Sequence, residues 1–173
     1  TISLDTKNNH VSPGWFDLHV NFCEPGFENR ETIKSGINAS IKGGFTGVNM
    51  MPNTNPPLDN KSLIEFVKSK SEKNIVDVYA SSNLTVCGDG KELVEINDLY
   101  QSGCKSFTDD KKPLENNKLL NICLEYTKDL NALVMHFPHD KSLANNGIVN
   151  EGEICTKLGL KGISNISEYL KTL

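Results

Sequence analysis

The sequence lacks several features that would assign it to a whole class of proteins. Its formal net charge is -4, and lysine and arginine are not in excess, which argues against a nucleic-acid partner. No apolar run approaches the roughly 20 residues that a membrane-spanning helix requires. The first ten residues also lack the basic-then-apolar order of a signal peptide. We therefore expect a cytoplasmic protein that binds neither nucleic acid nor membrane.

Cysteine is too scattered to build a disulfide framework or a zinc site made of thiolates. The cysteines are odd in number, and no two of them form a C-x-x-C pair. Reduced thiols are the simplest interpretation. The five are Cys23, Cys87, Cys104, Cys123 and Cys155.

What the chain does contain is a repeated alternation of β-rich and amphipathic segments. Its 173 residues, 37% of them hydrophobic, suffice for one globular domain. From the second β-rich run onward, the runs begin at intervals of 28 to 30 residues, which is about the length of one βα unit. The predicted strands cover residues 15–22, 45–51, 75–86, 104–108 and 132–137.

The segments between these runs have the helical period. Ile33, Ile37 and Ile41 lie four residues apart, and Asn60 is a plausible cap for the helix that follows it. Alternating strands and helices predict a parallel sheet, either doubly wound or barrel-shaped. The other apolar stripes are Leu63, Ile64 and Val67; Leu93, Ile96 and Tyr100; and Leu119, Cys123 and Tyr126 or Thr127.

Polar residues gather where the predicted strands end, as a barrel would require. His19, Asn21 and Cys23 follow one another at the two-residue spacing that places side chains on one face of a strand. Three further polar segments, 51–57, 108–110 and 136–140, close later strands. Each of these four polar segments alone could be a turn or a helix cap. Four of them at the same end of the sheet favour a functional site.

These motifs together resemble the dihydroorotases of the amidohydrolase superfamily. The stretch VSPGWFDLHVNFCEPGF is similar to the family pattern V-x-P-G-x-x-D-x-H-x-H-x-R-E-P-G, and MPNTNPP is similar to M-P-N-T-x-P. KSFTDDKKP looks like F-[ST]-D-D-G, and the segment from His136 to Ile163 resembles the H-C-E-[DE] stretch and the LGL-x-G-I run.

The resemblance implies a zinc-dependent (β/α)₈ TIM barrel that interconverts N-carbamoyl-aspartate and dihydroorotate in pyrimidine synthesis. Carried over residue by residue, it makes His19, Asp110 and His136 the metal ligands, with Asp109 as the fallback for Asp110. It makes Asn53 a substrate-binding residue. The family's catalytic aspartate, on the eighth strand, is expected beyond the end of this chain.

The chain departs from the family pattern at residues that carry chemistry. Asn21 occupies the place of the second histidine of H-x-H, and Cys23 that of the arginine that holds the substrate carboxylate. An amide oxygen is a poor zinc ligand, and a thiol lacks the charged fork of arginine. We expect Asn21 and Cys23 to line the substrate site all the same. Cys23 as a nucleophile is disfavoured, because no histidine stands at a helpful spacing.

Five strands do not close an eight-stranded barrel. No sixth strand is evident after His136, so residues 11–173 are interpreted as the N-terminal part of the barrel. Residues 1–10 are interpreted as a remnant of the flanking β-sandwich. An open barrel leaves sheet edges uncovered, which predicts marginal stability or a homo-oligomer.

Three functions stay open at this point. The first is a dihydroorotase-type cyclic amidohydrolase, partial and impaired. The second is a catalytically inactive homologue that serves as a scaffold partner of aspartate transcarbamoylase. The third is a one-metal hydrolase with a different, uncharged substrate.

Overall fold

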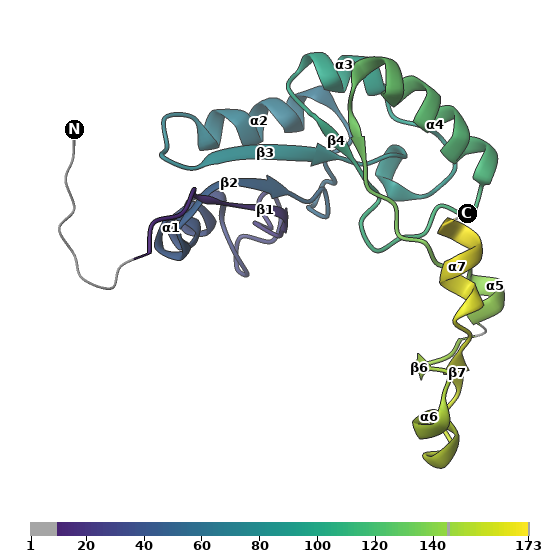
Figure 1. Ribbon diagram of the computed structural model, residues 1–173. Helices are drawn as coiled ribbons and strands as arrows, with labels where there is room; N and C mark the ends of the chain where they lie inside the picture. The colour runs from purple at the N-terminus through teal and green to yellow at the C-terminus, as the bar shows by residue number, and fades with distance from the viewer. Residues whose placement is uncertain (1–9, 145, 173) are drawn as a thin grey trace.

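A curved sheet of five parallel strands forms the body of the protein (Figure 1). The computed structural model describes residues 10–144 and 146–172. The spatial order of the strands follows their order in the chain, and the four helices between them cover the outer face, so the sheet is half of a barrel. The strands are β1 (Trp15–Val20), β2 (Phe45–Met50), β3 (Asp77–Ser82), β4 (Ser106–Phe107) and β5 (Leu133–Val134). The helices are α1 (Ile33–Gly43), α2 (Lys61–Ser71), α3 (Ile96–Gln101) and α4 (Asn117–Leu130).

The helices begin and end at residues that satisfy their terminal backbone groups. Thr32 caps α1, because its hydroxyl accepts from the backbone N–H of Ser35, and Gly44 ends the helix in the left-handed conformation at φ 79°. The Asn60 side chain accepts from the backbone N–H of Leu63 at 3.2 Å, which confirms the predicted cap of α2.

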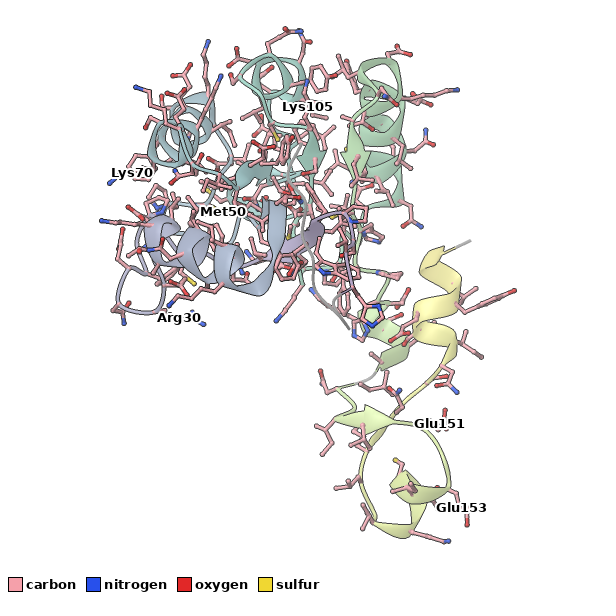
Figure 2. All side chains as sticks on the ribbon, turned by 60° about the vertical axis from the view of Figure 1, so that its left-hand side comes forward. Arg30, Met50, Lys70, Lys105, Glu151 and Glu153 are labelled. Carbon is pink, nitrogen blue, oxygen red and sulfur yellow. The ribbon has the colours of Figure 1, made fainter. Side chains whose placement is uncertain are left out.

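The hydrophobic core lies between the sheet and these helices. Met50, labelled in Figure 2, and Phe107 are fully buried on the strands. Ile33 and Ile37 of the predicted α1 stripe and the predicted α2 stripe belong to the same core, whereas Ile41, at the end of α1, is 43% exposed. Full burial of such a side chain stabilises the fold by about 1.5–3 kcal/mol relative to exposure. The core residues from the helices are Ile33, Ile37, Ile64, Val67, Ile96, Leu99 and Cys123.

All five predicted strands are longer than the observed ones, and at two of them a specific turn or bridge explains where the strand ends. β1 ends at Val20 rather than at residue 22, because the chain turns at Cys23, whose φ is 59°. The third strand ends at Ser82, and Leu93 pairs with Thr85 in an isolated antiparallel bridge instead of opening α3. Both corrections concern loops at the C-terminal ends of strands.

Within the described residues no sixth strand joins the five-stranded sheet, as predicted, but two short strands that the sequence did not reveal follow His136. β6 (Val149–Asn150) and β7 (Gly162–Ile163) pair with each other in parallel and form a separate two-stranded sheet. With α5 (Lys141–Ala144), α6 (Glu153–Lys157) and α7 (Ile166–Thr172), they extend away from the five-stranded body (Figure 1). Strands of two residues are too short to leave an alternating pattern in the sequence.

Two further expectations concern the N-terminus and the membrane. Residues 1–9, which hold most of the expected β-sandwich remnant, lie outside the described residues. No helix within 10–144 or 146–172 combines the length and the apolar character needed to cross a bilayer.

The inner face of the sheet is apolar and uncovered by the described residues. Phe16 is 49% exposed and Leu18 is 57% exposed, and both line a cavity of about 210 Å³ with Tyr79 and Leu133. The rings of Phe16 and Tyr79 lie 5.8 Å apart. This inner face is the one that a closed barrel buries.

A cluster of three polar side chains crosses the middle of the sheet. The Asn49 amide donates to the Ser81 hydroxyl at 2.8 Å, and the Ser81 and Ser106 hydroxyls lie 2.7 Å apart. The Ser106 hydroxyl donates to Oδ1 of Asn49 at 3.0 Å, which closes the triangle. The same Asn49 amide donates to the Leu18 carbonyl, so the cluster ties β1, β2, β3 and β4 together.

The exposed inner face predicts self-association of the 173-residue chain. Phe16→Glu places a charge on this face, so the variant should sediment closer to the monomer than the unsubstituted chain does. Tyr126→Glu, on the exposed side of α4, is the matched control and should leave association unchanged. Sedimentation velocity checks the result. A monodisperse, cooperatively melting monomer would contradict the prediction.

Because the thiols of Cys104 and Cys123 are buried, we predict that the free energy of unfolding falls at alkaline pH. Burial raises the pKa of Cys104, and likewise that of Cys123, from 9.0 to about 11. The folded state therefore keeps both protons between pH 9 and 11 while the unfolded state releases them. The stabilisation is complete below pH 9 and is lost as the pH rises toward 11, by at most about 1.4 kcal/mol per pH unit and thiol.

Urea unfolding at a series of pH values between 8 and 11 measures this loss. Cys104→Ala should reduce the slope of unfolding free energy against pH. Cys87→Ala removes an exposed thiol and should leave the slope unchanged. Equal slopes in all three proteins would contradict the assignment.

Candidate active site

Four polar side chains meet at the C-terminal edge of the sheet. Nε2 of His19, on β1, lies 2.7 Å from Oδ1 of Asp110, which follows β4. The Asn53 amide, after β2, donates to Oδ1 of Asn21 at 2.7 Å and to Oδ2 of Asp110 at 3.2 Å. The carboxylate of Asp110 thus joins strands that lie far apart in the sequence. The predicted convergence of His19, Asn53 and Asp110 is present.

Asp110 reaches this position because the backbone turns sharply after β4. Its φ is 54°, a left-handed conformation that aspartate tolerates better than most residues. Its backbone N–H donates to the hydroxyl of Thr108 at 2.9 Å, which supports the turn. Successive carboxylates, Asp109 and Asp110, consequently have different surroundings.

Asp109 is a buried structural acceptor. It is 6% exposed, and its Oδ1 accepts from the Asn83 amide and from the backbone N–H groups of Leu84 and Thr85 at 2.9–3.2 Å. Its Oδ2 accepts from the Thr85 hydroxyl at 2.7 Å. Four hydrogen bonds occupy this carboxylate, so the geometry favours Asp110 over the fallback Asp109 as the residue that faces the site.

Two cavities are lined by side chains of this cluster, and Asp110 lines the first of them. One, of about 440 Å³, is lined by Asn53 and Asp110 together with Asn83, Lys111 and Lys112. The other, of about 370 Å³, is lined by His19 and Asn21. The first has the volume of a small-molecule site, for which about 300–1,000 Å³ is usual.

Cys23 does not line the site, and His136 is not grouped with His19 and Asp110 closely enough for the three to hold a metal ion. Cys23 is 9% exposed, its Sγ lies 3.5 Å from the Asn21 carbonyl oxygen, and it lines neither cavity. The two-residue alternation fails here because β1 ends before Cys23. His136 follows β5 and is half-buried. Their predicted roles in binding substrate and metal stay predictions.

The described residues do not form a zinc centre by themselves. No three His, Cys, Asp or Glu side chains within them are grouped closely enough to hold a metal ion. His19 and Asp110 are zinc-type donors in contact, but catalytic zinc sites usually take three protein ligands. The amide oxygens of Asn21 and Asn53 suit harder ions.

Sequence reasoning missed the loop after β3. Asn83 and Thr85 hold Asp109, and Asn83 also lines the larger cavity, although this loop contributed no predicted site residue. This loop follows the C-terminal end of a parallel strand, and that position alone could have marked it as part of the site. Lys111 stands where the family pattern D-D-G has its glycine, and neither Lys111 nor Lys112 was predicted as a site residue.

Comparison with known proteins decides the family. The model of the family described as "Dihydro-orotase-like" matches residues 9–173. The chain belongs to the dihydroorotase-like family. It is 42% identical over 165 residues to a dihydroorotase of Pelotomaculum thermopropionicum, covering 95% of this chain and 39% of that protein. It is 36% identical over 171 residues to a dihydroorotase of Trichlorobacter lovleyi, with 98% and 40% covered.

The same fold occurs in a solved dihydroorotase. The structure of the Saccharomyces cerevisiae enzyme in complex with 5-fluoroorotic acid matches with a TM-score of 0.55 and 14% identity. The match covers 83% of this chain and 39% of that one. The chain therefore spans about 40% of the length of the dihydroorotases it matches, and the half-barrel corresponds to that part of the fold.

The role of Asp109 predicts a strong effect on stability. Asp109→Ala leaves buried donors of the β3 loop without an acceptor, so the free energy of unfolding should fall by about 2–4 kcal/mol. Asp129→Ala removes an exposed carboxylate from α4 and should change it by less than about 0.5 kcal/mol. Urea unfolding at pH 7 checks both. Equal effects would contradict the structural role of Asp109.

Proposed function

We propose that this dihydroorotase-like protein acts on the ring of dihydroorotate, interconverting it with N-carbamoyl-aspartate. The observation that carries the proposal is the contact of His19, Asn53 and Asp110 at the C-terminal edge of a parallel half-barrel. In this fold class, the C-terminal edge is where active sites are built. The dihydroorotases of P. thermopropionicum and T. lovleyi support the substrate class.

The hydrogen bonds in the cluster assign a role to each of its side chains. Asp110 holds the imidazole of His19 through Oδ1 and the amide of Asn53 through Oδ2, so one carboxylate orients both. Both amide hydrogen bonds of Asn53 come from Nδ2. Its Oδ1 accepts no hydrogen bond from the described residues and would accept a ring N–H of the substrate.

Zinc is part of this proposal through the family alone. His19 and Asp110 would be two of its ligands, and His136 is the candidate for a third. The described residues group only two such donors, so no reaction step is assigned here through the metal.

The second candidate function is the inactive scaffold partner of aspartate transcarbamoylase. It is favoured by the same shortage of donors and by Asn21 in the place of a histidine. The two candidates differ in zinc content and in turnover, and both can be measured on the purified protein.

Substitution of His19 tests the proposed activity. His19→Ala should lower kcat/KM for dihydroorotate by about 100-fold or more, because it removes a residue of the site together with the hydrogen bond to Asp110. His10→Ala, an exposed histidine outside the cluster, should leave kcat/KM unchanged. Loss of dihydroorotate followed by ultraviolet absorbance, with zinc analysis of each protein, provides the measurement.

The outcomes separate the two candidates. Turnover that depends on His19, with bound zinc, supports the amidohydrolase. No turnover and no zinc, with co-purification of a transcarbamoylase, supports the scaffold. Turnover that is unaffected by His19→Ala would contradict the proposed site.

A further inference from the structure

We propose that Asn21 is a positioning residue, which holds the side-chain amide of Asn53 so that only the carbonyl oxygen of Asn53 is left for a ligand. The inference rests on the proposed function, because it names the group of the substrate that Asn53 would recognise, a ring N–H. Position 21 is one of the places where the chain departs from the dihydroorotase pattern, which has a histidine there. The contacts of Asn21 indicate what the asparagine does in place of that histidine.

The neighbours of Asn53 fix the orientation of its side-chain amide. A carboxylate only accepts hydrogen bonds, so the atom of Asn53 that lies 3.2 Å from Oδ2 of Asp110 is the donor Nδ2. The same Nδ2 donates to Oδ1 of Asn21 at 2.7 Å. An amide NH₂ group has two N–H donors, and these two acceptors use both of them.

Asn53 consequently has no N–H group left for a ligand. Its Oδ1 accepts no hydrogen bond from the residues that the structure describes, so Asn53 offers an acceptor and no donor. The ligand group that fits such a side chain is an N–H, whereas a ligand oxygen or an N-methyl group finds no partner on it. Asn21 causes this selectivity, because without it one N–H of Asn53 would be available again.

The backbone holds the loops after β1 and β2 against each other on both sides of this contact. Before it, the N–H of Met51 donates to the carbonyl oxygen of Val20 at 2.9 Å. After it, the N–H of Asn55 donates to the carbonyl oxygen of Pro25 at 2.9 Å. The loops approach so closely there that a Cβ on Gly26, whose φ is +96°, would collide with the Asn55 carbonyl oxygen. The contact between the two asparagines is therefore set by the fold and needs no ligand to form.

Two substitutions of similar shape separate the acceptor oxygen of Asn21 from its volume. Asn21→Leu removes the acceptor and keeps most of the shape, whereas Asn21→Asp keeps an acceptor oxygen in the same place. Asn38→Ala, at an exposed asparagine of α1 outside the cluster, is the matched control. Circular dichroism melts confirm that each variant is folded.

Hydrogen exchange of the Asn53 side-chain amide, followed by NMR, measures the contact itself without a ligand. The two protons are assigned as the signals that disappear in Asn53→Ala. Asn21→Leu should speed the exchange of one of them about threefold to tenfold, because it removes one of the two hydrogen bonds. Asn21→Asp and Asn38→Ala should each change the exchange by less than about twofold.

Calorimetric titration with 5-fluoroorotic acid and with its 1-methyl and 3-methyl derivatives measures recognition of the ring N–H. One of the two methylated compounds should bind the unsubstituted chain about tenfold more weakly than the parent, because methylation removes the N–H that Asn53 accepts. Asn21→Leu should reduce this preference about threefold to tenfold, and Asn21→Asp and Asn38→Ala should retain it. All three probes carry the same charge, so the charge that Asn21→Asp adds cancels in the ratio of affinities.

The outcomes distinguish the positioning role from the proposed function. Faster exchange and a smaller preference in Asn21→Leu alone support the role. Exchange or preference that Asn21→Leu leaves unchanged overturns the role, and the proposed function stands. Loss of the preference in Asn21→Asp as well means that Asn21 acts through its own N–H groups, which also overturns the role. Faster exchange in Asn21→Leu without binding of any probe supports the hold on Asn53 and counts against the proposed function.

Discussion

The buried carboxylate of Asp109 is the constraint on which the candidate site depends. It follows β4 immediately and accepts hydrogen bonds from the Asn83 amide, from the backbone of Leu84 and from the backbone and hydroxyl of Thr85. These bonds attach the end of one strand to the loop after its neighbour. Because Asp109 is held there, the next residue leaves in a left-handed turn, and the Asp110 carboxylate faces β1.

The rest of the site follows from parallel strand order. Residues that close β1, β2 and β4 lie at one edge because every strand runs in the same direction, so a histidine, an asparagine and an aspartate from three distant segments contact one another. Membership of the dihydroorotase-like family explains why that edge carries polar side chains at all. The described residues then offer two adjacent metal donors at this edge, His19 and Asp110, and no group of three.

Much of the fold could be predicted from the sequence because its signals are local. The Asn60 cap and the repeat of β-rich runs depend on neighbouring residues, and the observed cap and the five-stranded order confirm them. The family motifs also placed His19, Asn53 and Asp110 at one edge. The separate roles of Asp109 and Asp110 could not be read in advance, because a difference in burial between adjacent identical residues comes from tertiary contacts. Cys23 was misplaced for a similar reason, since a turn, and not the strand period, sets its direction.

The triangle of Asn49, Ser81 and Ser106 has a further consequence. Oδ1 of Asn49 can only accept, so the single proton of Ser106 must go to it, and Ser81 must then donate to Ser106. The Leu18 carbonyl fixes the amide in the matching orientation, so all three donors point the same way around the ring. In a circular arrangement of this kind, loss of any one hydrogen-bonding side chain leaves a buried donor on one neighbour and a buried acceptor on the other without a partner, so the three groups stabilise the layer as a unit.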